Sequence, residues 1–281
     1  MRLGDLELRF VSDGRFRLDG GMMFGVVPRL LWERSRPPDE RNRVGLSLNC
    51  LLIQRGSDYA LIDTGLGTNL TPHEREVIWG LAPGPRLLDS LADLGLAPED
   101  ISLVINTHLH TDHCGGDTIV RNGRLVPTFP RARYVVQRRE WEDFNNTNER
   151  TRGSYATQLL QPLAESGQLE LLEGETQVAP HLRCIPTPGH TRGHQSILVG
   201  EGEKKALHLG DAAPFTVHFE RIAWIPGMDL QQLESLESKR RLLNEALAND
   251  YLLIFYHEDT LAAARLVKEG DGHQIVPVSH G

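Results

Sequence analysis

Residues 107–116 contain an unusual concentration of side chains that could bind metal ions. Within six positions lie His108, His110, Asp112 and His113. An apolar run with several β-branched residues, 101–106, precedes them and two glycines follow, which is typical of a turn that leaves a buried strand. Side chains two positions apart on an extended segment point to the same side, so the two His of the His-x-His pair can bind one ion. Asp112 and His113 are then free to bind a second ion.

Chance alone gives some close histidine pairs in a chain with 12 His among 281 residues. The Asp-His pair that follows at this offset, between a strand and two glycines, makes an accidental cluster a poor explanation. The motif His108-x-His110-x-Asp112-His113 resembles the signature of the metallo-β-lactamase superfamily of dinuclear metallohydrolases.

This resemblance implies three further ligands downstream. Each follows a short apolar run in this sequence, and they are His190 in a Pro-Gly-His loop, Asp211 after a Leu-Gly pair, and His257. By the same resemblance, one ion is bound by His108, His110 and His190. The other ion is bound by Asp112, His113 and His257. Asp211 bridges the two ions, Asp63 orients the metal-site loop, and His194 is structural rather than a ligand.

The implied donor set is rich in nitrogen and includes two carboxylates, which favours zinc, although iron, cobalt or manganese would also fit. Two ions roughly 3.5–4 Å apart would hold a bridging water and lower its pKa towards about 7, giving a hydroxide nucleophile at neutral pH. Asp112 either passes a proton to the leaving group or serves only as a ligand. Asp211 is the second carboxylate expected to take part in catalysis.

These ligands need strands and helices to position them. The apolar patterns predict strands over 6–11, 50–54, 59–62, 101–106, 134–137, 169–172, 182–185, 196–199, 206–209 and 251–256. They predict helices over 87–96, 140–144, 151–164 and 230–248, the last capped by Asp229. A turn is expected at Asp13-Gly14, and a hairpin over 262–278 turns at 270–272, although its first arm could be helical.

The pattern by itself supports only an α/β fold with many strands. The resemblance adds the αββα sandwich, in which two mixed β-sheets face each other and helices flank both, with residues 1–281 forming a single domain. Segment 15–44 sustains neither a strand nor a helix period, yet it is too apolar for a surface loop. We expect either a lid over the metal site or an arm that packs on a second copy in a homodimer, and both can hold.

Substrate-pocket residues are harder to assign from the sequence. The lid interpretation nominates methionine and aromatic residues of 15–44 together with residues that follow Asp211. They are Met22, Met23, Phe24, Phe215 and His218. Packing is the more common role for aromatic residues such as Phe24 and Phe215 and for His218.

Composition excludes several classes of function. A net charge of −8 and a pI near 5.8 offer no basic surface for nucleic acid. Three scattered cysteines form no disulfide framework and suit a reducing compartment. The first residues lack a signal-peptide pattern, and the sequence contains no run of about 18 apolar residues of the kind that crosses a membrane. We therefore expect a cytoplasmic protein that acts on a small molecule.

The flanking sequence is most similar to the superfamily branch of quorum-quenching lactonases and methyl-parathion-hydrolase-like enzymes. The resemblance implies hydrolysis of small apolar esters, with acyl-homoserine lactones placed ahead of organophosphate triesters or other phosphoesters. Lactonases of this branch usually carry Tyr three residues after the bridging Asp, and this chain has Pro214. A non-catalytic metal-binding protein is the alternative from another class, and comparing metal-free with metal-loaded activity discriminates it.

Overall fold

The computed structural model describes residues 1–202, 204–270 and 272–278. Its strands form two large sheets and a small hairpin of β6 (Thr118–Arg121) with β7 (Arg124–Pro127). The first sheet contains, in spatial order, β1 (Arg2–Leu3), β2 (Leu6–Asp19), β3 (Arg43–Arg55), β4 (Asp58–Ile62), β5 (Ile101–Ile105), β8 (Arg133–Gln137) and β9 (Leu169–Leu172). The second contains β10 (Thr176–Ala179), β11 (Leu182–Pro186), β12 (Gln195–Glu201), β13 (Lys204–His208), β14 (Leu252–Ile254), β15 (Ala263–Glu269) and β16 (Gly272–Pro277).

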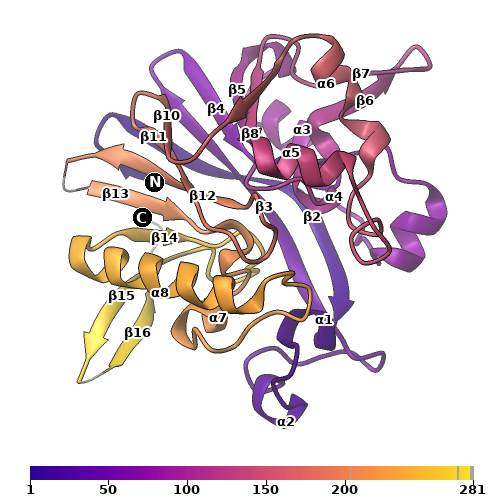
Figure 1. Ribbon diagram of the computed structural model, residues 1–281. Helices are drawn as coiled ribbons and strands as arrows, with labels where there is room; N and C mark the ends of the chain where they lie inside the picture. Colours follow the sequence, from indigo (N-terminus) through magenta and orange to yellow (C-terminus); the bar gives the residue numbers. More distant parts are fainter. Residues whose placement is uncertain (203, 271, 279–281) are drawn as a thin grey trace.

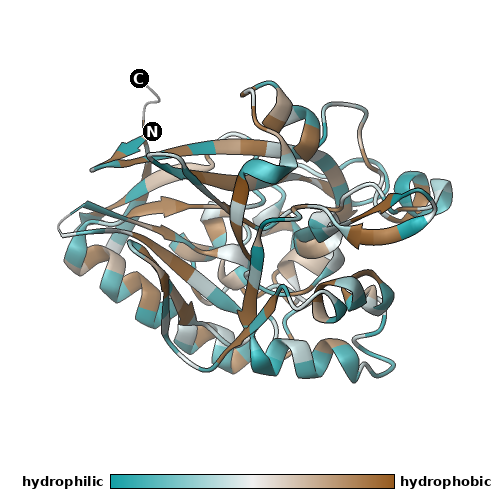
Figure 2. Cartoon of the chain, turned by 90° about the horizontal axis from the view of Figure 1, so that it is seen from above, coloured by the Kyte–Doolittle hydropathy of each residue, from teal (hydrophilic) through white to brown (hydrophobic). Residues whose placement is uncertain are grey.

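Both sheets are mixed, as expected. In the first sheet β4, β5, β8 and β9 run parallel, and in the second β13 runs parallel to β14. A core of small and branched side chains fills the space between the sheets, for example Ile62 and Ile105 from the first and Ile197 and Ile254 from the second. Figure 2 shows hydrophobic residues gathered on the strands. Strand alternation therefore gives each sheet one face for this shared core.

Helices cover the outer faces of the sandwich (Figure 1). On the first sheet they are α3 (Leu87–Ala92), α5 (Arg138–Asn145) and α6 (Gln161–Glu165), and on the second α7 (Thr216–Glu220) and α8 (Gln232–Asn249). A separate apolar cluster lies under each set, with Leu91 and Phe144 in one and Leu242 and Ala246 in the other. Three apolar layers between four layers of secondary structure make the αββα sandwich.

The turn expected at Asp13-Gly14 is wrong, because β2 continues through these residues to Asp19. Ser12 pairs with Asn49 and Arg15 with Ser47, so two residues of β2 lie opposite one residue of β3. This bulge directs the Asp13 carboxylate inward, where it accepts hydrogen bonds from the backbone N–H groups of Gly67 and Leu87. The alternation of the sequence is broken by a bulge and not by the end of the strand.

Segment 15–44 is also more regular than the sequence suggested. Its ends belong to β2 and β3, and between them lie two short helices, α1 (Gly20–Phe24) and α2 (Arg29–Trp32). The ring of Phe24 in α1 stacks on the ring of Trp32 in α2 at a centroid distance of 4.8 Å, so the two short helices contact each other. The two helices project from one end of the sandwich (Figure 1). Whether this segment acts as a lid, a dimer arm or both stays a prediction.

Two helix predictions need correction. Over 151–164 the chain forms only a 3₁₀ turn, Thr157–Leu159, and the start of the short helix α6, whose first turn contains Pro162. In α8, Leu233 is 80% exposed although it was assigned to the apolar face. The buried face of α8 instead includes Ser238, Lys239 and Leu242, so small and long polar residues complete it. In the part of the chain that is described, no helix is long and apolar enough to cross a membrane.

Candidate metal centre

The seven predicted ligands come from four loops that leave strands of both sheets. β5 leads into the extended segment with His108 and His110, and the short helix α4 (Thr111–Cys114) carries Asp112 and His113. From the second sheet come three more: His190 in the loop after β11, Asp211 in the 3₁₀ turn Gly210–Ala212 after β13, and His257 after β14. Because both sheets end at this edge, the loops bring together residues that lie up to 149 positions apart in the printed sequence, from His108 to His257.

The side chains fall into two groups that meet at Asp211. In the first group, Nε2 of His190 lies 3.0 Å from Nδ1 of His110 and 3.3 Å from Oδ2 of Asp211. In the second, Nε2 of His257 lies 3.6 Å from Oδ2 of Asp112 and 3.2 Å from Oδ1 of Asp211. Each oxygen of Asp211 therefore faces a different group. Potential metal-binding sets are His108 with His110 and His190, Asp112 with His113 and His257, and His108 with His113 and Asp211.

Hydrogen bonds fix which nitrogen of each ring faces the centre. Nδ1 of His190 donates to Oδ1 of Asp229 at 2.9 Å, Nδ1 of His113 to Oδ2 of Asp63 at 2.9 Å, and Nδ1 of His257 to the Ser47 carbonyl at 2.9 Å. Thr107 donates its own hydroxyl proton to Asp63, so it accepts from Nδ1 of His108 at 3.1 Å. In a neutral ring the other nitrogen, Nε2, is then left without a proton. In their neutral forms, these four imidazoles thus present bare nitrogens to the centre.

Several of these inward atoms are buried without a hydrogen-bond partner. They are Nε2 of His108, Nε2 of His113 and Oδ1 of Asp211. A buried polar atom left unpaired costs about 1–3 kcal/mol, so three in one place indicate a ligand that satisfies them together. Bare imidazole nitrogens and carboxylate oxygens suit a divalent transition metal, with zinc favoured. The residues present therefore fit the expected metal.

Burial and the crowding of carboxylates and imidazoles shift the pKa values of the site residues in both directions. Burial alone would raise the pKa of Asp211, but His257, His113 and His190 hold that pKa well below its usual range, so the carboxylate is ionised. Burial lowers the pKa of His108 far below its ordinary value, and the neighbouring histidines add to the effect, so this ring is neutral. Burial alone would lower the pKa of His113 and His190, but the nearby Asp211 raises the pKa of both rings, so a bound metal ion would take the place of their protons.

The role assigned to Asp63 by resemblance is matched by its contacts. Asp63 is fully buried and adopts a positive φ of 56°. Its Oδ1 accepts from the backbone N–H of Thr107 at 2.7 Å, while Oδ2 accepts from the Thr107 hydroxyl and from His113. One carboxylate thus holds the start of the His108 loop and orients a ring of the second group. This geometry suits the proposed orienting role.

His194 is also placed as expected for a structural residue. Its Nε2 accepts the backbone N–H of Asp211 at 3.0 Å, and its Nδ1 donates to the Thr187 hydroxyl at 2.8 Å. A Cβ at Gly210 would come within 2.7 Å of the same Nε2, and Gly210 has a φ of +54°. Glycine is required here because a side chain would push His194 away from the turn that presents Asp211.

Asp229 was missed as a site residue. We predicted it as the helix cap of 230–248, but α8 starts after Gln231, and the Asp229 side chain turns to His190 instead. The prediction failed because a carboxylate before a helix usually finds free N–H groups at its own helix. Here the chain folds back through Leu230 and Gln231, whose N–H groups bond to the carbonyls of His190 and Gly189. No local pattern in the sequence signals that contact.

Three of the predicted pocket residues, Phe24, Phe215 and His218, pack on one another, and most of the predicted set has no free surface. Met23, Phe24, Phe215 and His218 are each 0% exposed, whereas Met22 is 43% exposed. The Phe24 ring lies 5.2 Å from the His218 ring and 6.2 Å from the Phe215 ring, so segment 20–24 packs on the start of α7. Contact of these four residues with a substrate would require the segment to move. Their assignment to the substrate pocket stays a prediction.

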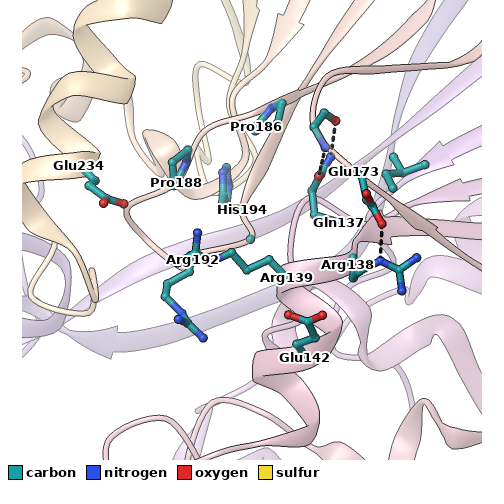
Figure 3. A pocket seen from close by; sticks show the side chains of 13 residues that line it. Gln137, Arg138, Arg139, Glu142, Glu173, Pro186, Pro188, Arg192, His194 and Glu234 are labelled. Carbon is teal, nitrogen blue, oxygen red and sulfur yellow. Dashed lines mark hydrogen bonds and ion pairs between the residues drawn. The ribbon is translucent and has the colours of Figure 1, made fainter.

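A surface groove of about 720 Å³ lies away from the predicted ligands. It is lined by Arg139 and Glu142 of α5, Glu234 of α8 and the outer side of the loop with Pro188 and Arg192 (Figure 3). None of the seven predicted ligands lines it. This groove is therefore the outer face of the loop whose inner face carries His190.

Known structures share this fold. A probable metal-dependent hydrolase from Staphylococcus aureus superposes with a TM-score of 0.90 and 28% identity, over 100% of this chain and 99% of that one. An N-acyl homoserine lactone hydrolase with N-hexanoyl-L-homoserine bound at its catalytic metal centre has a TM-score of 0.69 and 25% identity, over 92% and 94% of the two chains.

Sequence relatives point the same way. An N-acyl homoserine lactonase from a Bacillus species is 30% identical over 263 residues, which is 90% of this chain and 93% of that one. Another from Rhizobium radiobacter is 29% identical over 74% of this chain and 80% of its own. Together with the fold and the donor set, these similarities define a metal-dependent hydrolase. The family model of the metallo-β-lactamase superfamily matches residues 43–280, and the chain belongs to that superfamily.

Proposed function

We propose that this protein is a dinuclear metal-dependent lactonase that opens acyl-homoserine lactones and similar small apolar esters. The observation that carries the proposal is the sharing of Asp211, which turns one oxygen towards each of two donor groups. Relatives at up to 30% identity that span most of the chain are named N-acyl homoserine lactonases, which supports the choice of substrate. Two zinc ions are the proposed cofactor.

The proposed ligands divide as the geometry groups them. His108, His110 and His190 would hold one ion, Asp112, His113 and His257 the other, and Asp211 both. When bound, the pair of ions would polarise the ester carbonyl and lower the pKa of a shared water, so that hydroxide is available near neutral pH. Asp229, Asp63 and the Ser47 carbonyl keep the ring protons on the outer nitrogens, so that the inner nitrogens stay free for the ions.

Asp112 is the proposed proton carrier for the leaving alkoxide. It is 6% exposed, more than Asp211 or His257 at 1% each, so solvent reaches this residue more than the other two. His110, at 7%, is the other proposed ligand with comparable exposure. A substrate would therefore approach between these two side chains. Opening a lactone keeps the leaving oxygen in the product, and a carboxylate at this position can return a proton to it.

The alternative within the same class is a phosphotriesterase-like or other phosphoester hydrolase. The centre would serve both reactions, since each needs an activated water and a polarised oxygen. Pro214 removes the tyrosine that lactonases of this branch usually carry three residues after the bridging aspartate, and this keeps the alternative open. A non-catalytic metal-binding protein remains the alternative from another class.

The experiment is kcat/KM for a series of acyl-homoserine lactones and for a paraoxon-type triester on one preparation with measured metal content. We expect lactone hydrolysis to exceed triester hydrolysis and to disappear on chelation. It should return when about two equivalents of zinc per chain are restored. Faster triester hydrolysis would transfer the assignment to the phosphoester alternative. A metal-loaded protein with no hydrolytic activity on either class would support the binding protein instead.

A further inference from the structure

The third residue of α5 is a buried carboxylate that lies against both loops of the first donor group. Glu140 is 0% exposed, whereas its neighbours Arg139 and Glu142 line the outer groove (Figure 3). Oε1 of Glu140 accepts the backbone N–H of Leu109 at 3.0 Å and the hydroxyl of Tyr155 at 2.9 Å. Oε2 accepts the hydroxyl of Thr191 at 2.6 Å.

These partners are adjacent to metal-site residues. Leu109 lies between His108 and His110, and Thr191 directly follows His190. One carboxylate therefore joins both chain segments that supply the first donor group. No lysine or arginine within the described residues pairs with Glu140, so the three donated hydrogen bonds are what offset the burial of its charge.

The backbone of α5 also touches the His190 loop. A Cβ at Gly193 would lie 2.3 Å from the backbone nitrogen of Glu140, so only glycine allows the loop to lie flat on the helix. The second donor group is held by other residues, since Asp63 bonds to His113 and the Ser47 carbonyl to His257. Asp63 also holds Thr107 beside His108 and so supports both groups, whereas the hydrogen bonds of Glu140 reach only the segments of the first group.

We propose that Glu140 is a positioning residue that clamps the loops of His108, His110 and His190 together before metal binds. It would thereby set the affinity of the first group separately from that of the second. This inference rests on the proposed function only in taking the two groups as metal sites. Glu140 touches neither substrate nor the reacting atoms.

The test compares Glu140→Met and Glu140→Gln with the parent protein and with Glu142→Met as a matched control on the exposed side of α5. Zinc affinities come from titration of metal-free protein against a competing chelator. We expect Glu140→Met to weaken one of two ions by about 10- to 100-fold, the usual effect of losing a partner that orients ligands. The other ion, and both ions in Glu142→Met, should stay within about threefold of the parent by the same reasoning.

Glu140→Gln should restore most of the affinity. Its carbonyl can accept from Leu109 and Tyr155, and its amide can donate to the hydroxyl oxygen of Thr191. Thr191→Val keeps the carboxylate and removes one link, so it should weaken the same ion by about 3- to 10-fold, as expected for one hydrogen bond. This variant tests the clamp even if Glu140→Met does not fold.

Amide hydrogen exchange of the metal-free protein gives a readout that does not depend on metal or activity. The Leu109 amide should exchange faster in Glu140→Met, while the Thr107 amide, bonded to Asp63 at 2.7 Å, should keep its protection. Equal loss of both protections, or equal weakening of both ions, would reduce Glu140 to an ordinary structural residue. A parent protein that binds fewer than two ions would instead contradict the proposed function. Amide exchange of Leu109 in the metal-free protein would still test whether Glu140 holds the loops together.

Discussion

Asp229 offers the sharpest test of how the centre is built, because within the described residues its one hydrogen bond from a side chain comes from Nδ1 of His190 at 2.9 Å. Asp229 is 5% exposed, so water screens this contact little. A hydrogen bond to a buried charged group contributes about 1.5–3 kcal/mol. At about 1.4 kcal/mol per factor of ten, removing the carboxylate should weaken binding of the ion held by His190 by about 10- to 100-fold.

The assay is zinc competition on metal-free Asp229→Ala and Asp229→Asn. Asparagine keeps an oxygen that accepts from His190 but loses the charge, and neutral hydrogen bonds are roughly half as strong. We therefore expect a loss of about 3- to 10-fold for Asp229→Asn. Asp250→Asn is the matched control, since Asp250 lies beyond the other end of α8 with its side chain 75% exposed and a left-handed φ of 49° that asparagine tolerates.

Parent-like zinc affinity in Asp229→Ala would refute the reasoning, because it would mean that His190 keeps its orientation without its partner. A loss of thermal stability with unchanged zinc affinity would lead to the same conclusion. If Asp250→Asn weakened zinc binding as much as Asp229→Asn, the effect would be one of charge and not of the His190 contact.

Three further predictions concern the rest of the molecule. Asp211→Ala should abolish zinc loading and hydrolysis together, and full activity in this variant would contradict the proposed centre. Burial raises the pKa of Asp117 to about 8, so the folded state holds a proton that the unfolded state releases near pH 4. The free energy of unfolding should therefore fall as the pH rises from about 4 to about 8. Asp117→Asn should show a smaller fall in Tm over that range, and a Tm profile identical to that of the parent would contradict this prediction. Arg36 pairs with the buried Glu258 and lies 4.1 Å from the Phe215 ring, so Arg36→Met should lower the free energy of unfolding in urea by about 3–5 kcal/mol. The same Arg36→Met change should cost less in a protein that already carries Glu258→Gln. An equal cost in the two backgrounds would exclude the ion pair as the cause.

The order of strands and helices could largely be predicted from the sequence because most elements carry their own local pattern. Residues 101–106 and 206–209 are compact apolar runs, and both became central strands. The predictions failed where the local pattern was interrupted for a tertiary reason. The bulge at Asp13 interrupts alternation so that a carboxylate can reach the N–H groups of Gly67 and Leu87, and nothing in residues 6–19 encodes those partners.

In the metal site, too, local sequence patterns predict some features and tertiary contacts set the others. The types and spacing of His108, His110, Asp112 and His113 are enough to predict metal binding from the sequence, and the family resemblance adds His190, Asp211 and His257. Only the tertiary structure decided which nitrogen of each ring faces inward and what fixes it. Asp229 is 39 positions from His190, and Glu140 is 31 positions from Leu109. Hydrogen bonds over such separations depend on where loops from different strands meet, and a local pattern shows that a residue is polar without showing which distant group it will meet.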